Sequence, residues 1–192
     1  KYDFCGTVCV SGRAICAVVS CFLRKIEYTG SNRKRLAAAD EGRTGKRSQY
    51  MKTGLVLEGG AMRGMFTAGV LDVLMEHGLT TDGTIGVSAG AVFGCNFKSH
   101  QIGRANRINL AFCNDSRFMG AASFASTGSI VGYDFIFNDV QDRLDPFDNE
   151  TFDASPIEMY AVATDMLFGT ATYLPVKSAV LDLDAVRAST SL

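Results

Sequence analysis

A single hydroxyl between two glycines is the feature of this sequence with the clearest chemical potential. In GTIGVSAGAV (83–92), Ser88 stands between Gly86 and Gly90 and follows a short apolar run. The pattern G-x-S-x-G, between a strand and a helix, is typical of the nucleophile elbow of serine hydrolases. Side chains at the two glycines would collide with neighbouring segments, and the N-terminus of the following helix favours negative charge nearby. The residues alone leave a second interpretation open, which is an ordinary tight turn.

A second glycine-rich segment, LEGGAMRG (57–64), also joins a predicted strand to a predicted helix. It does not match a dinucleotide-binding fingerprint, because Ala61 occupies the second glycine position, nor a P-loop, because no lysine follows Gly64. The remaining chemical interpretation is an oxyanion hole. In it, the backbone N–H groups of Gly59, Gly60 and Ala61 face the oxygen that becomes negative during acyl transfer. The alternative is a strand-to-helix turn without a chemical role.

A serine nucleophile needs a group that accepts its proton, and the two histidines are poorly placed for that role. His77 precedes Ser88 on a predicted helix, and His100 lies twelve residues after Ser88, near the end of the next predicted helix. In hydrolases with the order Ser…Asp…His, the histidine comes late in the chain. We therefore expect neither histidine to act as the general base.

The elements that must position these residues alternate regularly from Met51 onward. Short apolar runs predict strands at 53–58, 84–87, 159–165 and 171–176, and helical spacing predicts helices at 63–77, 89–100, 103–112 and 181–189. This order predicts an α/β fold with a mainly parallel sheet and helices on both faces. The stretch 134–148 is expected to be rich in loops, with Asp134, Asp145 and Asp148 as helix caps or surface charges.

The first 50 residues differ in character from the rest. An apolar run at 14–23 is too short to span a bilayer. The segment 24–50 is polar and basic and has almost no large apolar residues, which predicts a flexible tail. We expect residues 1–50 to be a disordered N-terminal extension and residues 51–192 to form the folded domain.

Composition excludes several classes of function. The formal net charge of −1 lacks the basic excess of a nucleic-acid-binding protein. Four of the six cysteines crowd the first 21 residues, but without paired C-x₂-C spacing or a nearby histidine, so we expect no metal site. Cys95 and Cys113 are interpreted as small core residues in a reducing compartment, which indicates a cytoplasmic protein.

Taken together, EGGAMRG and GVSAG, about thirty residues apart, resemble the patatin-like phospholipases, especially their bacterial members. The downstream segments CNDSRFMG, TGSIVGYDFIF and DPFDNETF resemble that branch too, so the resemblance runs over residues 53–192. One departure is Ala61, where the family usually has a third glycine. Alanine keeps the N–H group but disfavours positive φ, so we expect the oxyanion hole to survive if Ala61 has negative φ.

The resemblance implies a three-layer α/β/α patatin-like sandwich and a serine-dependent lipid acyl hydrolase of the phospholipase A or esterase type. Ser88 is then the nucleophile, Gly86 and Gly90 form the elbow, and no metal or organic cofactor is needed. The residues assigned to the oxyanion hole are Gly59, Gly60, Ala61, Arg63 and Gly64. The implied partners are a lipid or acyl-ester substrate and, transiently, a membrane surface, with no nucleic acid and with no prediction of oligomeric state. Met62, Met65, Phe66 and Phe93 are candidates to accept an acyl chain.

The resemblance also implies a Ser–Asp dyad, whose aspartate belongs to a D-G-G or D-G-A motif after a later strand. The one Asp-Gly pair here, Asp82-Gly83, precedes Ser88, and the ending RASTSL resembles the segment shortly upstream of that motif. We therefore expect this sequence to stop before the dyad aspartate and before its sheet is complete. Asp165 is a weak internal candidate, with a turn-forming role as its alternative. The alternative function is an inactive fragment or a lipid-binding module.

Overall fold

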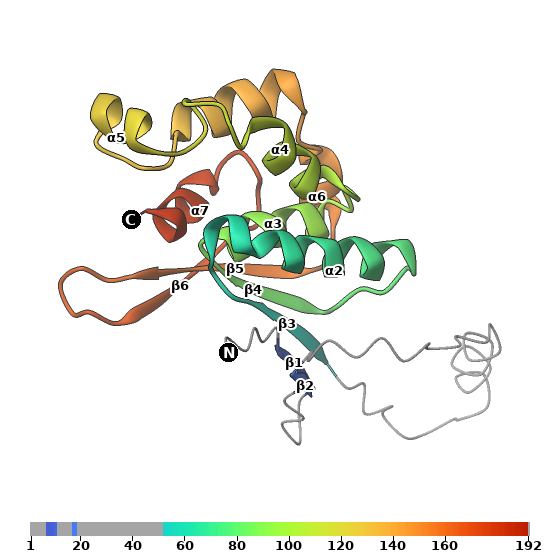
Figure 1. Ribbon diagram of the computed structural model, residues 1–192. Helices are drawn as coiled ribbons and strands as arrows, with labels where there is room; N and C mark the ends of the chain where they lie inside the picture. The colour runs from blue at the N-terminus through green and yellow to red at the C-terminus, as the bar shows by residue number, and fades with distance from the viewer. Residues whose placement is uncertain (1–6, 11–16, 19–51, 192) are drawn as a thin grey trace, which may run out of the picture.

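The computed structural model describes residues 7–10, 17–18 and 52–191, and of the first two segments only the backbone. Most of the predicted extension 1–50 therefore lies outside the described residues. Its two described parts are short strands, β1 (Thr7–Val10) and β2 (Ala17–Val18), at one edge of the sheet (Figure 1). The division of the chain at Met51 stays a prediction.

One sheet of six strands, in the order β2-β1-β3-β4-β5-β6, forms the base of the described structure. Its other four strands are β3 (Thr53–Leu57), β4 (Gly83–Val87), β5 (Glu158–Thr164) and β6 (Ala171–Pro175). Strands β3, β4 and β5 run parallel, whereas β1 and β6 are antiparallel to their neighbours. All four predicted strands are found, each within one residue of its predicted bounds. The predicted α/β class with a mainly parallel sheet is confirmed.

The register of the parallel strands brings three chain segments to the same edge of the sheet. Leu57 at the end of β3 is opposite Gly86, and Val87 at the end of β4 is opposite Val162 of β5. The carboxyl ends of these strands therefore lie together, which is where α/β proteins place their ligand sites. Ser88 and the glycine-rich segment both follow strands that end at this edge.

The helices include all four that the sequence predicts, with ends shifted by up to two residues. In chain order the helical elements are η1 (Ala61–Gly64), α2 (Met65–Glu76), α3 (Ala89–Lys98), α4 (Arg104–Phe112), α5 (Ala121–Thr127), η2 (Phe135–Leu144), α6 (Asn149–Ala154) and α7 (Leu183–Thr190). η1 is a 3₁₀ turn that occupies the glycine-rich segment, and η2 is a π-helix. The prediction that 134–148 is mostly loop is wrong, because η2 covers ten of these residues.

The aspartates of this stretch have structural partners. The Asp148 side chain caps α6 by accepting the Thr151 N–H group at 2.9 Å, as predicted. Asp145 instead binds two arginines of α4: its backbone oxygen accepts from Nη2 of the buried Arg104 at 2.6 Å, and its Oδ2 accepts from Nε of Arg107 at 2.6 Å. Asp134 precedes η2 without a capping hydrogen bond from its side chain. These contacts tie α4 to the segment between η2 and α6.

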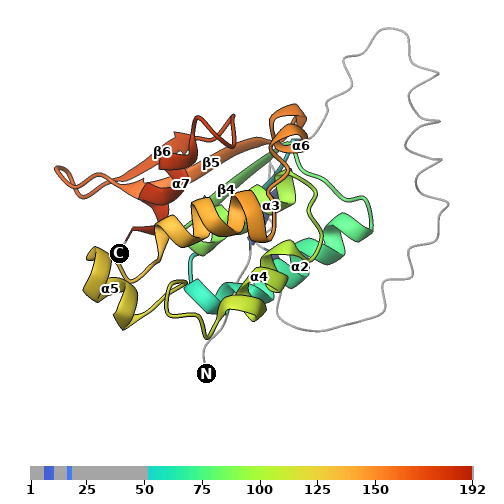
Figure 2. The same cartoon turned by 90° about the horizontal axis from the view of Figure 1, so that it is seen from above.

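The described helices lie on one face of the sheet (Figures 1 and 2). Burial alternates accordingly along β3, since Leu55 and Leu57 are buried whereas Val56 between them is 39% exposed. Two of the three expected layers are thus present, and the helical layer expected on the opposite face has no counterpart among residues 52–191.

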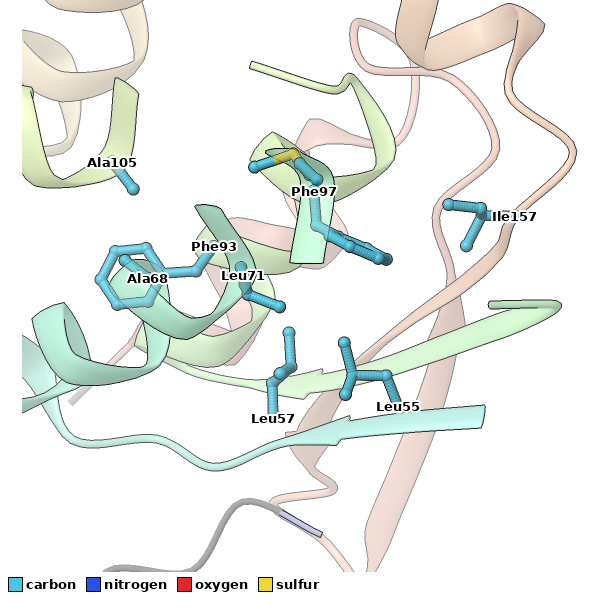
Figure 3. Packing of buried hydrophobic residues seen from close by; sticks show 9 residues of the cluster. Leu55, Leu57, Ala68, Leu71, Phe93, Phe97, Ala105 and Ile157 are labelled. Carbon is cyan, nitrogen blue, oxygen red and sulfur yellow. The ribbon is translucent and has the colours of Figure 1, made fainter. Parts of the chain in front are cut away.

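The core between sheet and helices is built from long apolar side chains of β3, α2 and α3 (Figure 3). Leu55 and Leu57 point up from β3 toward Leu71 of α2 and toward Phe93 and Phe97 of α3. A second cluster joins β5, through Met159 and Ala161, to α6 and α7. These two clusters fix α3 and α7 against the sheet, and α3 begins immediately after Ser88.

Candidate active site

Ser88 has a backbone conformation that side-chain-bearing residues rarely adopt. It lies between β4 and α3 with φ of 52° and ψ of −121°. Holding a non-glycine residue in such a conformation costs about 1–3 kcal/mol, and it persists only where the surrounding structure enforces it. Although Ser88 is the N-cap residue of α3, its side chain makes no capping hydrogen bond. The half-buried hydroxyl is therefore not engaged in a structural role in this helix.

The glycines on either side of Ser88 are required by close backbone approach. A methyl group on Gly86 would lie 2.5 Å from the backbone nitrogen of Ala91. One on Gly90 would lie 2.7 Å from the carbonyl oxygen of Glu58 and would also collide with the carbonyl of Leu57. Real Cβ contacts are not this short, so both positions exclude a side chain. The strand-to-helix turn closes tightly because these two residues have none.

Gly59 packs directly against the serine. A methyl group on Gly59 would lie 3.1 Å from the Ser88 Cβ and 3.1 Å from the Val87 carbonyl oxygen. The chain after Gly59 then turns into η1, where the Arg63 N–H group donates to the Gly60 carbonyl at 3.0 Å. The two glycine-containing segments, separate in sequence, are thus neighbours in space.

The remaining members of the predicted hole differ in their environment. Gly64 is buried against the ring of Phe93, with no room for a side chain, so it serves the packing of η1 on α3. The Arg63 side chain lies near Gly60, since its Nε would be 3.7 Å from a methyl group there. Arg63 therefore borders the glycine loop rather than pointing away from it.

Ala61 does not satisfy the condition stated from the sequence. Its φ is 45°, in the left-handed region, where an alanine is strained by roughly 1–2 kcal/mol. Its N–H group is nevertheless retained, and the residue lines the same cavity as Ser88. The loop keeps a glycine-like conformation although the glycine itself has been replaced.

That cavity, with a volume of about 120 Å³, extends from Ser88 beneath α4 and η2. Its walls are mainly apolar, and they include Val92, Phe93, Ile108, Phe118, Met119, Val131, Ile136, Phe137 and Val140. Of the four residues predicted to accept an acyl chain, Phe93 lines it. Met62 packs instead against the cluster of Phe118, Phe135 and Val140, and Phe66 is 55% exposed on α2. An apolar wall next to a hydroxyl suits an ester with a hydrocarbon chain.

A residue that the sequence analysis missed holds the elbow in place. The Ser88 N–H group donates to Oγ of Ser189 on α7 at 2.9 Å, and the Ser189 hydroxyl donates to the Val162 carbonyl of β5 at 2.6 Å. The buried hydroxyl thereby continues the β4–β5 ladder one step beyond Val87. With 101 residues between the two serines, no local pattern signals this contact.

The weak candidate for the base, Asp165, is occupied in the turn between β5 and β6. Its Oδ1 accepts the N–H groups of Leu167 at 2.8 Å and Phe168 at 3.1 Å. Its backbone N–H and carbonyl also close the turn, to Thr170 and Gly169. The geometry matches the turn-forming alternative. Asp82 lies at the other end of β4 from Ser88, where its Oδ2 accepts from the Thr53 N–H at 2.6 Å.

The histidines lie at the far ends of their helices. His77 follows α2, and its Nδ1 is 2.8 Å from the Val73 carbonyl. His100 lies just beyond α3, ten or more residues from the end of the helix that meets Ser88. At 1.5 Å of rise per residue, this separation is about 15 Å. The distance agrees with the prediction that neither acts as the base.

A second potential nucleophile close to the site is not activated. Burial raises the pKa of Cys95, on α3, to about 12, despite the nearby positive charges of Lys98 and Arg104. A thiol with such a pKa is protonated at neutral pH and reacts slowly. Among the described residues, no group of three or more His, Cys, Asp or Glu side chains has the arrangement of a metal site.

A parallel α/β sheet, a strained serine at a strand-to-helix turn and a glycine loop against it define the class of α/β serine acyl hydrolases. The sequence model of the patatin-like phospholipases matches residues 55–178, and the chain belongs to this family. The uncharacterized protein YjjU of Escherichia coli (strain K12) is 29% identical over 143 residues. The match covers 72% of this chain and 39% of YjjU, so the chain spans well under half of that relative's length.

Proposed function

We propose that this chain carries the nucleophile and the oxyanion-binding loop of a lipid acyl hydrolase. The observation that carries the proposal is the positive φ of Ser88 at the β4–α3 turn, with Gly59 packed against it. The strain that Ser88 bears has no use in packing, because the hydroxyl does not cap the helix. It is accounted for if the conformation serves to present Oγ to a substrate.

In the proposed reaction, Ser88 Oγ attacks the carbonyl carbon of an ester as its proton passes to a general base. The tetrahedral intermediate collapses to an acyl-serine and the alcohol departs with a proton. Water then attacks the acyl-serine, which releases the fatty acid and restores the hydroxyl. The apolar walls next to Ser88, formed by Val92, Phe93 and Ile108 among others, would hold the acyl chain.

The negative charge on the carbonyl oxygen would be met by backbone donors. The N–H groups of Gly59, Gly60 and Ala61 are the proposed donors, and the positive end of the α3 dipole faces the same place. Arg63 and Gly64 support this loop, the first beside Gly60 and the second packed on α3. One such donor contributes about 3–4 kcal/mol to transition-state stabilisation in well-studied hydrolases.

The general base is the remaining component. The family resemblance implies an aspartate in a D-G-G or D-G-A motif, and no Asp-Gly pair follows Ser88 in this sequence. The Asp165 carboxylate is held by the turn N–H groups. This observation favours a second candidate function for the chain as it stands: it binds and slowly traps acyl electrophiles without rapid turnover, because an unassisted serine hydroxyl is a weak nucleophile.

The test is covalent labelling with a fluorophosphonate, which reacts with serines held beside an oxyanion hole. The proposal predicts an adduct on Ser88, located by peptide mass spectrometry, and its loss in Ser88→Ala. Ser126→Ala, on the exposed surface of α5, is the matched control and should keep the adduct. Hydrolysis of a p-nitrophenyl ester by the same proteins separates the two candidates. An adduct on Ser88 with turnover supports the hydrolase, and an adduct without turnover supports the trapping module. Failure of the folded protein to label at Ser88 would contradict both.

A further inference from the structure

The turn between β5 and β6 exposes three consecutive large apolar side chains. Met166 is 97% exposed, Leu167 88% and Phe168 78%. The hairpin that carries them projects beyond the body of the molecule in both views (Figures 1 and 2). Residues 166–168, which we call the hairpin tip, are the most exposed run of large apolar residues in the described chain. Contiguous exposed apolar surface of this kind marks an interaction site.

The hairpin tip lies at the edge of the sheet where Ser88 is found. Strand β5 is parallel to β4, with Val162 opposite Val87, so both strands end at this edge. Ser88 is the first residue after β4, and the tip begins two residues after the last residue of β5. Helix α5, with Phe124 57% exposed, lies at the same end of the molecule in both views.

The backbone of the tip is arranged so that water is not needed to satisfy it. The N–H groups of Leu167 and Phe168 donate to Oδ1 of Asp165, and the Gly169 N–H donates to the Asp165 carbonyl. A segment that enters an apolar medium must satisfy its polar backbone groups internally, because each unpaired group costs several kcal/mol. A single aspartate below the three apolar residues provides these acceptors.

We propose that the hairpin tip inserts into the interfacial region of a lipid bilayer and holds the Ser88 edge of the sheet against the lipid surface. The benefit to catalysis rests on the proposed function, but insertion itself does not. From Asp165 to Pro175 the sequence has no lysine or arginine, so insertion is driven by apolar area and not by anionic lipids. In the described part of the chain, no helix is long and apolar enough to cross a membrane, which leaves attachment from one side.

A second copy of the chain is a less suitable occupant. Three side chains of this size expose roughly 500 Å² at most, whereas a stable protein interface buries about 800 Å² on each partner. A bilayer has no such requirement, because each large side chain adds to partitioning on its own. The projecting shape of the hairpin suits insertion between lipid headgroups better than a flat contact.

The chain has no tryptophan, which allows a single fluorescent probe. We would introduce Phe168→Trp into Ser88→Ala, so that no hydrolysis alters the lipid, and add phosphatidylcholine vesicles with brominated acyl chains. The proposal predicts a blue shift of the introduced indole and quenching by bromine. The control is Leu181→Trp in the same background. Leu181 is 85% exposed, but it follows β6, whose end lies opposite the start of β5 at the other edge of the sheet. Its emission should not change.

A second pair of variants measures the contribution to affinity. Co-sedimentation with the same vesicles should weaken about 100-fold in Leu167→Ser/Phe168→Ser, roughly tenfold for each side chain. It should be unchanged in Val180→Ser/Leu181→Ser, and high salt should not weaken it. Equal quenching at both probe positions, an unshifted indole at position 168, or a blue shift that depends on protein concentration without lipid would overturn the proposal. Fluorophosphonate labelling of Ser88 in solution, with Ser88 intact, is expected to persist in the tip variant, so failure of insertion and failure of the proposed chemistry are distinguishable.

Discussion

Replacing Ser189 by alanine would remove the hydroxyl that joins the Ser88 N–H group to the Val162 carbonyl. The distances of 2.9 and 2.6 Å and the burial of Ser189 mean that both backbone groups lose their partner in a place with little access to water. An unsatisfied buried polar group costs about 1–3 kcal/mol, so the free energy of unfolding should fall by roughly 2–4 kcal/mol.

The effect should reach the site, because Ser189 restrains the strained backbone of the nucleophile. We expect Ser189→Ala to slow fluorophosphonate labelling of Ser88 at temperatures where the variant remains folded. Ser189→Thr retains the hydroxyl and should recover most of the labelling rate. Ser191→Ala is the matched control, because this exposed serine donates to the Arg187 carbonyl of the same helix.

Urea unfolding followed by circular dichroism gives the stability, and labelling time courses give the rate. A change in unfolding free energy below about 0.5 kcal/mol for Ser189→Ala, the ordinary range for surface substitutions, would refute the reasoning. So would an equal change in Ser191→Ala.

Three further predictions concern single positions. Ala61→Gly should raise the unfolding free energy by up to about 1 kcal/mol, since glycine relieves the strain at φ 45°; a loss of stability in urea unfolding would contradict this. Gly90→Ala should cost more than about 3 kcal/mol or prevent folding, because its methyl group meets the Leu57 and Glu58 carbonyls. Gly69→Ala, inside α2 with 3.8 Å to the nearest atom, should be neutral or stabilising in the same denaturation assay. With its pKa raised to about 12, Cys95 stays a thiol at pH 8 and should resist iodoacetamide in the folded protein, whereas the exposed Cys113 should react; peptide mapping that finds both alkylated at equal rates would contradict this.

The sequence predicts the parallel strands and the main helices well, because their signals are local. Short apolar runs bounded by glycines mark β3 and β4, and the spacing of G-x-S-x-G marks the turn between β4 and α3. The two glycine segments also meet as predicted. Both follow parallel strands, and the carboxyl ends of parallel strands lie at one edge.

The features that the sequence does not reveal depend on contacts between distant segments. Ser189 reaches Ser88 only because α7 packs on β5. The positive φ of Ala61 is imposed by the loop around it, against the preference of alanine. The helices α5 and α6 are short, and η2 is a π-helix whose buried Phe135, Phe137 and Val140 do not follow the α-helical period.

The measurement that tests the account most directly is fluorophosphonate labelling of the native protein and of the same protein unfolded in urea. If the β4–α3 turn and the glycine loop activate Ser88, the native protein forms one adduct, on Ser88, and the unfolded protein forms none at that rate. If the native protein labels no faster than the unfolded one, or labels equally in Ser88→Ala, the strained turn does not present a nucleophile and the proposed function is wrong.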